Sequence, residues 1–150
     1  MDVFLTYLAT LGFIGYLPVA PGTFGSLAAM VFFLFLRPSL PLHILILVVV
    51  AAVGTLASHR AEKVLNENDS SHIVIDEFTG YAVSLLWLPL TLSYAFSAFL
   101  LFRFFDILKP PPIRWIERKI PGGAGVMADD VLAAIYTNII LQVWILLAKH

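Results

Sequence analysis

The chain has 150 residues, of which 60% are hydrophobic and only 13% charged; its mean hydropathy is +0.92 and its formal net charge is −1. Ordinary soluble domains carry about 45–50% apolar and about 25% charged residues, so this composition predicts a single integral membrane domain over residues 1–150. The absence of cysteine excludes a thiolate nucleophile, a disulfide framework and a thiolate-bound zinc site.

The first third of the chain predicts an interfacial helix followed by a helical hairpin. Residues 3–17 are apolar but short for a span, so we expect a helix in the membrane interface or packed across the others. A Pro- and Gly-rich loop follows at Gly15–Gly25, where Thr23 could bind a phosphate oxygen, but the pattern alone favours a plain connection into the next helix. Two short apolar segments, Phe24–Leu36 and Leu42–Ala57, then flank a turn.

The long apolar run from Phe78 to Phe102 permits two layouts. A single span kinked at Pro89 suits the roughly 20 residues that cross a bilayer. Alternatively, two shorter helices turn near Pro89–Ser93, which returns the chain to the face from which it came. The last helix is expected at Val131–Ala148, and the whole chain is expected to form an all-α bundle of short spans.

The distribution of basic residues favours the two-helix layout. Under it, most of the basic residues share one face, namely Arg60, Lys63, Arg103, Lys109, Arg114, Arg118 and Lys119. Only Arg37 and Lys149 then lie on the opposite face. Because loops rich in Lys and Arg stay on the cytoplasmic side, we expect the charged face to be cytoplasmic.

Carboxylates gather at the ends of these predicted helices. Asp76 and Glu77 stand at the N-terminal end of one helix, Asp129 and Asp130 at that of the last, and Asp106 lies near the end of a helix that prolines must stop. The helix dipole explains one acid at a helix start, but less easily a pair at both. Such oxygen ligands suit Mg²⁺, which predicts a metal cluster of Asp76, Glu77, Asp106, Asp129 and Asp130, with Asp69 as a further candidate.

Basic side chains accompany these acids. Arg103, Asp106 and Lys109 have i, i+3, i+6 spacing and are expected on one helix face, where they could equally form a salt-bridge ladder at the water line. Arg103, Lys109 and Arg114 suit the binding of a phosphate. His59 and His72 are left outside the site, since a single histidine at a helix end is more often a polar cap.

The combination of motifs resembles the phosphatidylglycerophosphatase A family. The resemblance is carried by APGTFGSLAA at 20–29, IVIDEFTG at 73–80 and FRFFDILKPPPIRWIERKIPGGAGVMADDVLAA at 102–134. It implies an enzyme of the bacterial cytoplasmic (inner) membrane that uses Mg²⁺ to remove the terminal phosphate of phosphatidylglycerophosphate, giving phosphatidylglycerol. The acidic motif positions of the family fall on Asp76, Glu77, Asp106, Asp129 and Asp130, with Lys109 and Arg103 as basic partners.

Two other functions remain open at this point. The acids could line the pathway of a small ion or proton transporter, as intramembrane acids often do. The basic loop could instead bind anionic headgroups in a non-catalytic lipid-binding membrane protein. The clustering of the acids beside Pro- and Gly-rich loops favours a surface site. The resemblance implies an anionic phospholipid substrate in a membrane, and no nucleic acid is expected as partner.

Overall fold

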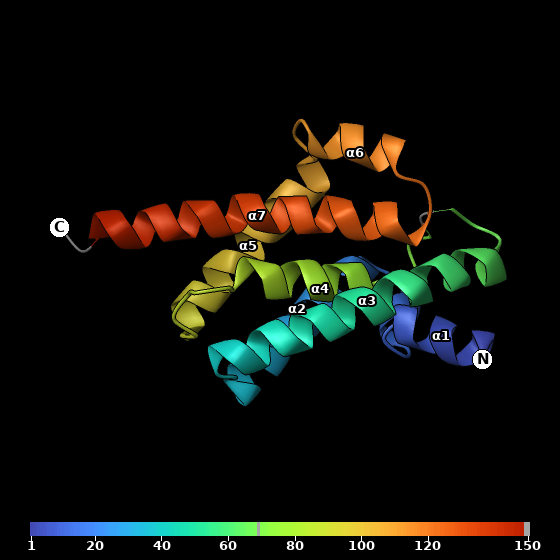
Figure 1. Ribbon diagram of the computed structural model, residues 1–150, viewed down its shortest axis with the longest axis horizontal. Helices are drawn as coiled ribbons and strands as arrows, with labels where there is room; N and C mark the ends of the chain where they lie inside the picture. The colour runs from blue at the N-terminus through green and yellow to red at the C-terminus, as the bar shows by residue number, and fades with distance from the viewer. Residues whose placement is uncertain (69, 149–150) are drawn as a thin grey trace.

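The computed structural model describes residues 1–68 and 70–148, and these residues form helices without a β-strand (Figure 1). Asp69 and Lys149, which entered the predictions above, lie outside the described residues. In chain order the elements are α1 (Asp2–Ala9), the 3₁₀-helix η1 (Ile14–Tyr16), α2 (Pro21–Leu36), α3 (Leu40–Leu65), α4 (Ile75–Ser84), α5 (Leu92–Leu108), α6 (Ile113–Lys119) and α7 (Gly123–Ala148). The all-α prediction is confirmed.

Two helices, α3 and α7, are long and apolar enough to cross a membrane, with 26 residues each. Only 17% and 22% of their most apolar stretches are buried, so most of these apolar side chains face outward, unlike those of a soluble core helix. The bundle therefore has the exterior of a small membrane protein. Beyond its apolar segment α3 continues through polar residues to Leu65, and α7 is longer than predicted because it already begins at Gly123.

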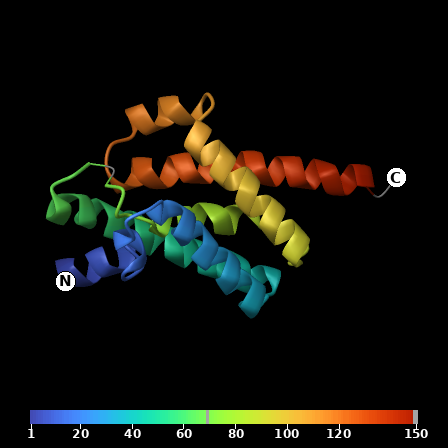
Figure 2. The same cartoon turned by 180° about the vertical axis from the view of Figure 1, so that it is seen from behind.

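The apolar run after Glu77 forms two helices rather than one span. The first, α4, ends at Ser84, and α5 begins at Leu92, where the Thr91 hydroxyl accepts a hydrogen bond from the Tyr94 amide. Both views show that α4 enters the bundle from the end that holds the N-terminus and that α5 returns toward that end (Figures 1 and 2). The start of α4, the end of α5 and the start of α7 are thereby brought to one end of the molecule.

Side chains from α7 bind the carbonyl groups at the interrupted end of α4. The Asn138 side-chain amide donates to the carbonyl oxygens of Ser84 at 3.0 Å and Leu86 at 2.8 Å, and Gln142 donates to Leu86 at 3.1 Å. A helix end leaves its last carbonyls without intrahelical partners, and inside lipid no water can replace them. These two polar residues therefore allow a helix to stop within the apolar bundle.

A third polar side chain, from α3, acts at the same place. The buried His43 Nε2 lies 2.9 Å from the carbonyl oxygen of Ala82, and its ring packs on Phe33 with centroids 4.5 Å apart. The end of α4 is thus held from two sides, by α3 and by α7.

Small residues let α4 pack closely against its neighbours, as is common among helices in membranes. A Cβ added to Gly80 would lie 2.8 Å from the ring of Phe102 on α5 and 3.0 Å from the Cβ of Asp130 on α7. Tyr81 is fully buried beside it and donates to the Ala95 carbonyl at 2.8 Å. This close contact sets the distance between α4 and the acids of α7.

We expect Asn138→Leu to destabilise the protein, because it leaves the carbonyls of Ser84 and Leu86 short of donors while keeping the side-chain volume similar. Interhelical hydrogen bonds of this kind contribute about 0.6 kcal/mol on average and up to about 1.7 kcal/mol. Thermal unfolding in detergent would measure the effect. The matched control is Ile139→Leu, at an exposed neighbouring position; equal unfolding midpoints for the two variants would contradict the assigned role of Asn138.

Candidate active site

The five predicted acids line one hollow of about 260 Å³ at the end of the bundle where α4 begins. They come from three elements: Asp76 and Glu77 from the first turn of α4, Asp106 from the last turns of α5, and Asp129 and Asp130 from α7. Lys109, Ile107 and the loop residues Ser70, Ser71 and Ile73 complete the lining. The acids are spread over more than 50 positions of the sequence, from Asp76 to Asp130, and the α4–α5 hairpin brings them together.

Three of these acids are close enough to share one cation. One carboxylate oxygen each from Asp76, Glu77 and Asp130 lies within 4.8 Å of the other two. Asp76 Oδ1, Glu77 Oε2 and Asp130 Oδ2 are buried and accept no hydrogen bond from the part of the chain that the structure describes. Buried carboxylate oxygens without partners are costly, and a hard divalent cation such as Mg²⁺ prefers such ligands. The residues therefore fit a metal ion.

The surroundings of the acids on α4 disfavour their charged forms. Burial raises the pKa of Asp76 well above its ordinary value, and the neighbouring Glu77 raises it further. Burial also raises the pKa of Glu77, from 4.5 to about 7, and the charge of Asp106 adds to this while Arg103 opposes it. A cation between these carboxylates would restore the charged forms.

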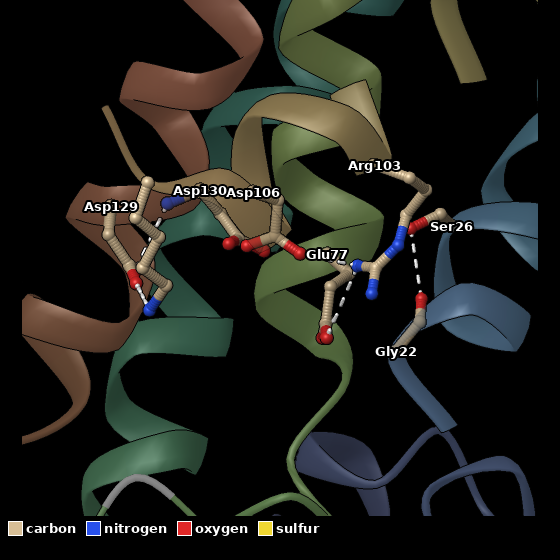
Figure 3. A network of polar contacts seen from close by, with 8 residues as sticks. Gly22, Ser26, Glu77, Arg103, Asp106, Asp129 and Asp130 are labelled. Carbon is tan, nitrogen blue, oxygen red and sulfur yellow. Dashed lines mark hydrogen bonds and ion pairs between the residues drawn. The ribbon is translucent and has the colours of Figure 1, made fainter. Parts of the chain in front are cut away.

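Two basic side chains pair with the outer carboxylates (Figure 3). Arg103 Nη1 lies 2.6 Å from Asp106 Oδ2 and 3.7 Å from Glu77 Oε1, so this guanidinium joins α5 to α4. Lys109 Nζ lies 2.7 Å from Asp129 Oδ2 on α7. The predicted ladder therefore holds for Arg103 and Asp106 but not for Lys109. Lys109 ends α5 in the left-handed region, with φ 45°, and its side chain crosses to α7 instead.

The position of Asp129 and Asp130 corrects one prediction. We expected them at the start of the last helix, but α7 begins at Gly123, so both acids lie in its second turn. The early start is possible because Gly123 packs directly on α3, where a Cβ would lie 2.5 Å from the backbone of Thr55 and His59. Helix-dipole capping therefore does not explain this acidic pair, and Asp129 Oδ1 accepts the adjacent amide of Asp130 at 3.0 Å.

Of the four predicted phosphate-binding residues, Lys109 lines the hollow, whereas Thr23, Arg103 and Arg114 do not. Thr23 is half-buried in the first turn of α2, and Arg114 is exposed on α6, where it donates to the Leu108 carbonyl at 3.4 Å. Their roles in phosphate binding stay predictions. His72, which we left outside the site, bonds the Gly15 carbonyl through Nδ1 at 2.8 Å.

Gly22 is a residue of the site that sequence reasoning missed. A Cβ on Gly22 would overlap Glu77 Oε1 and would lie 2.8 Å from Glu77 Cδ and 3.3 Å from Arg103 Nη1. The carbonyl of Gly22 accepts the hydroxyl of Ser26 at 2.9 Å, which fixes this first turn of α2 (Figure 3). The glycines of the APGTFGS segment were the available signal, but the segment was interpreted through Thr23.

The sequence profile of the phosphatidylglycerophosphatase A family matches residues 7–145. A protein of Escherichia coli K12 named phosphatidylglycerophosphatase A is 37% identical over 139 residues, which cover 90% of this chain and 80% of the relative. One of the same name from Haemophilus influenzae is 40% identical over 148 residues, covering 93% and 90%. A Bacteroides thetaiotaomicron protein, provisionally named a phosphatidylinositol-3-phosphatase, is 39% identical over 155 residues, covering 95% and 96%. No solved structure matches the chain.

We expect the metal-free protein to lose stability as the pH rises from about 4.5 to about 7, because the folded state binds the Glu77 proton more tightly than the unfolded state does. The stability from this raised pKa is fully present below about 4.5 and is lost as the pH passes the folded value near 7. Thermal unfolding midpoints in a chelator, measured across this range, test the expectation.

Glu77→Gln should reduce the fall of the unfolding midpoint with pH over this range. Glu67→Gln, at an exposed position, should leave that fall unchanged. The same slope in wild type and Glu77→Gln would show that the burial of Glu77 does not affect its proton affinity.

Proposed function

Because the chain belongs to the phosphatidylglycerophosphatase A family, we propose that it hydrolyses the terminal phosphomonoester of phosphatidylglycerophosphate in a Mg²⁺-dependent reaction. The products would be phosphatidylglycerol and inorganic phosphate. The observation that carries the metal dependence is the buried trio of Asp76, Glu77 and Asp130, whose inner oxygens have no partner among the described residues.

In this proposal, Asp76, Glu77 and Asp130 hold the metal. When bound, Mg²⁺ supplies positive charge that neutralises the phosphate oxygens and promotes attack by water. Asp106 and Asp129 also line the hollow, but each already has an oxygen paired with a basic side chain, at 2.6 and 2.7 Å. Their role is therefore to hold Arg103 and Lys109 in place as well as to add negative charge beside the metal.

The two basic residues have different tasks. Lys109 lines the hollow, so its ammonium group would contact the phosphoryl oxygens and stabilise the charge that develops there. Asp129 keeps that ammonium group pointed into the hollow. Arg103 does not line the hollow, and its contacts are with Asp106 and Glu77. It is therefore a positioning residue, which fixes the carboxylates of α4 and α5 relative to each other.

The placement of charge supports a site at one membrane surface rather than a transport pathway. The acids gather at one end of the bundle, together with the basic residues at the ends of α3 and α5 and on α6, whereas Arg37 lies at the opposite end, between α2 and α3 (Figure 1). By the positive-inside rule, this end would face the cytoplasm of a bacterial inner membrane.

The Bacteroides relative suggests a second substrate. Its name refers to phosphatidylinositol 3-phosphate, which is also a membrane lipid with a phosphomonoester. The acid cluster would treat the two phosphate groups alike, so discrimination must come from the rest of the headgroup. The assay below therefore includes both lipids.

Phosphate release from phosphatidylglycerophosphate in detergent micelles, with Mg²⁺ or with EDTA, tests the proposal. We expect release only with Mg²⁺, and a slower reaction with phosphatidylinositol 3-phosphate. Asp76→Asn and Asp130→Asn each remove a proposed ligand, so each should lower kcat/KM by at least the roughly 10- to 100-fold typical of a lost outer-shell partner.

The control is Asp2→Asn, which removes an exposed carboxylate 3.8 Å from Arg60 and should keep the wild-type rate. Full activity in EDTA, or wild-type rates in both ligand variants, would contradict the proposed metal chemistry.

A further inference from the structure

An apolar groove of about 990 Å³ lies on the outside of the bundle, between the segment around η1 and one face of α2. Its lining consists of apolar side chains, including Phe13, Leu17, Phe24, Ala28, Val31 and Phe35. The small Ala28 lies between larger side chains one turn before and one turn after it along α2. The groove therefore has the size and chemistry to hold a flexible hydrocarbon chain.

The groove is lined by the face of α2 that does not pack in the bundle core. The core face is formed by Gly22, Gly25, Ser26, Ala29, Met30 and Phe33, all of them buried. Phe24, Ala28, Val31 and Phe35 follow the helical repeat on the other side, and Phe24, Val31 and Phe35 are exposed by 43%, 46% and 87%. Because α2 is apolar on both faces, its outer face is suited to contact with lipid.

Both walls of the groove are attached to the segment that carries Asp76 and Glu77. On the α2 side, Gly22 lies directly against the Glu77 carboxylate. On the η1 side, Gly15 accepts a hydrogen bond from His72 at 2.8 Å, and a Cβ there would overlap the carbonyl oxygen of His72. The groove and the acid-lined hollow share no lining residue, but the segments that form them are in direct contact.

The length of the groove also fits a lipid chain. From Phe24 to Leu36, α2 rises by roughly 18 Å at about 1.5 Å per residue. One leaflet of the hydrocarbon core is about 15 Å thick, half of the roughly 30 Å of a bilayer. The groove thus extends over about the depth of one leaflet, starting from the end of α2 that contacts Glu77.

We propose that this groove binds an acyl chain of the phospholipid whose phosphomonoester enters the acid-lined hollow. The inference rests on the proposed phosphatase function and adds a binding site for the apolar part of the substrate. The chain in the groove positions the lipid for hydrolysis, and a lipid with short chains loses this contact.

The test compares phosphatidylglycerophosphate with two palmitoyl chains, in mixed micelles, and with two hexanoyl chains. Val31→Trp fills the groove, whereas Val48→Trp makes the same change on the outward face of α3, where Val48 is 60% exposed. Since packing rather than exclusion of water drives contacts within lipid, we expect Val31→Trp to raise KM for the long-chain substrate by about five-fold. Its kcat/KM for the short-chain substrate, and both values for Val48→Trp, should stay at the wild-type level.

An unchanged long-chain KM in Val31→Trp, or an equal loss with both substrates, would overturn the groove while leaving the phosphatase function intact. Wild-type protein that hydrolyses neither substrate would overturn the proposed function, and the groove with it.

A second measurement does not depend on the folding of a variant. Wild-type protein is irradiated with phosphatidylglycerophosphate that carries a diazirine on its palmitoyl chain, and the labelled peptides are identified. We expect labelling concentrated in residues 13–36, reduced by excess unlabelled substrate but not by phosphatidylcholine. Labelling spread evenly over α3, α5 and α7, or lost equally with phosphatidylcholine, would show ordinary lipid contact and overturn the proposal.

Discussion

The hydrogen bonds at the interrupted end of α4 are the interactions on which the rest of the structure depends. A helix that ends inside an apolar bundle must find donors for its last carbonyls, and Asn138, Gln142 and His43 provide them from α7 and α3. Once these carbonyls have hydrogen-bond donors, the chain can turn and return as α5. The return places Asp106 and Lys109 beside the start of α4, and without it the acids would lie on opposite sides of the bundle.

The second constraint is electrostatic and opposes stability. Asp76, Glu77 and Asp130 are held close together and buried. The nearby cations Arg103 and Lys109 pair with Asp106 and Asp129, and Arg103 also lies 3.7 Å from one oxygen of Glu77. Close packing at Gly22 and Gly80 keeps the carboxylates from moving apart. Such an arrangement is unfavourable in the absence of a cation, which is typical of a site maintained for function rather than for stability.

The sequence allowed much of the site to be predicted, because its chemistry lies in local motifs. Asp76 and Glu77 were correctly placed in the first turn of a helix, and the one-sided distribution of basic residues correctly favoured two helices over a single span. The start of α7 was wrong, since it depends on the packing of Gly123 against α3, which no local pattern reveals.

Contacts between distant segments were also beyond prediction. The pairing of Lys109 with Asp129 depends on the left-handed end of α5. The roles of Asn138 and Gln142 depend on where α4 stops. The role of Gly22 depends on its contact with Glu77, which lies 55 positions later in the sequence. In each case the residue type was visible, but its partner was set by the tertiary structure.

The central claim is that the buried carboxylates form a divalent-cation site, and the dependence of thermal stability on Mg²⁺ tests it most directly. A ligand that binds only the folded state stabilises it by about 2.7 kcal/mol at a hundred times its dissociation constant. The unfolding midpoint of the wild-type protein should therefore rise as Mg²⁺ is titrated into chelator-treated protein, and that of an Asp76→Asn/Asp130→Asn double variant should not. No rise in the wild type, or an equal rise in the double variant, would contradict the account.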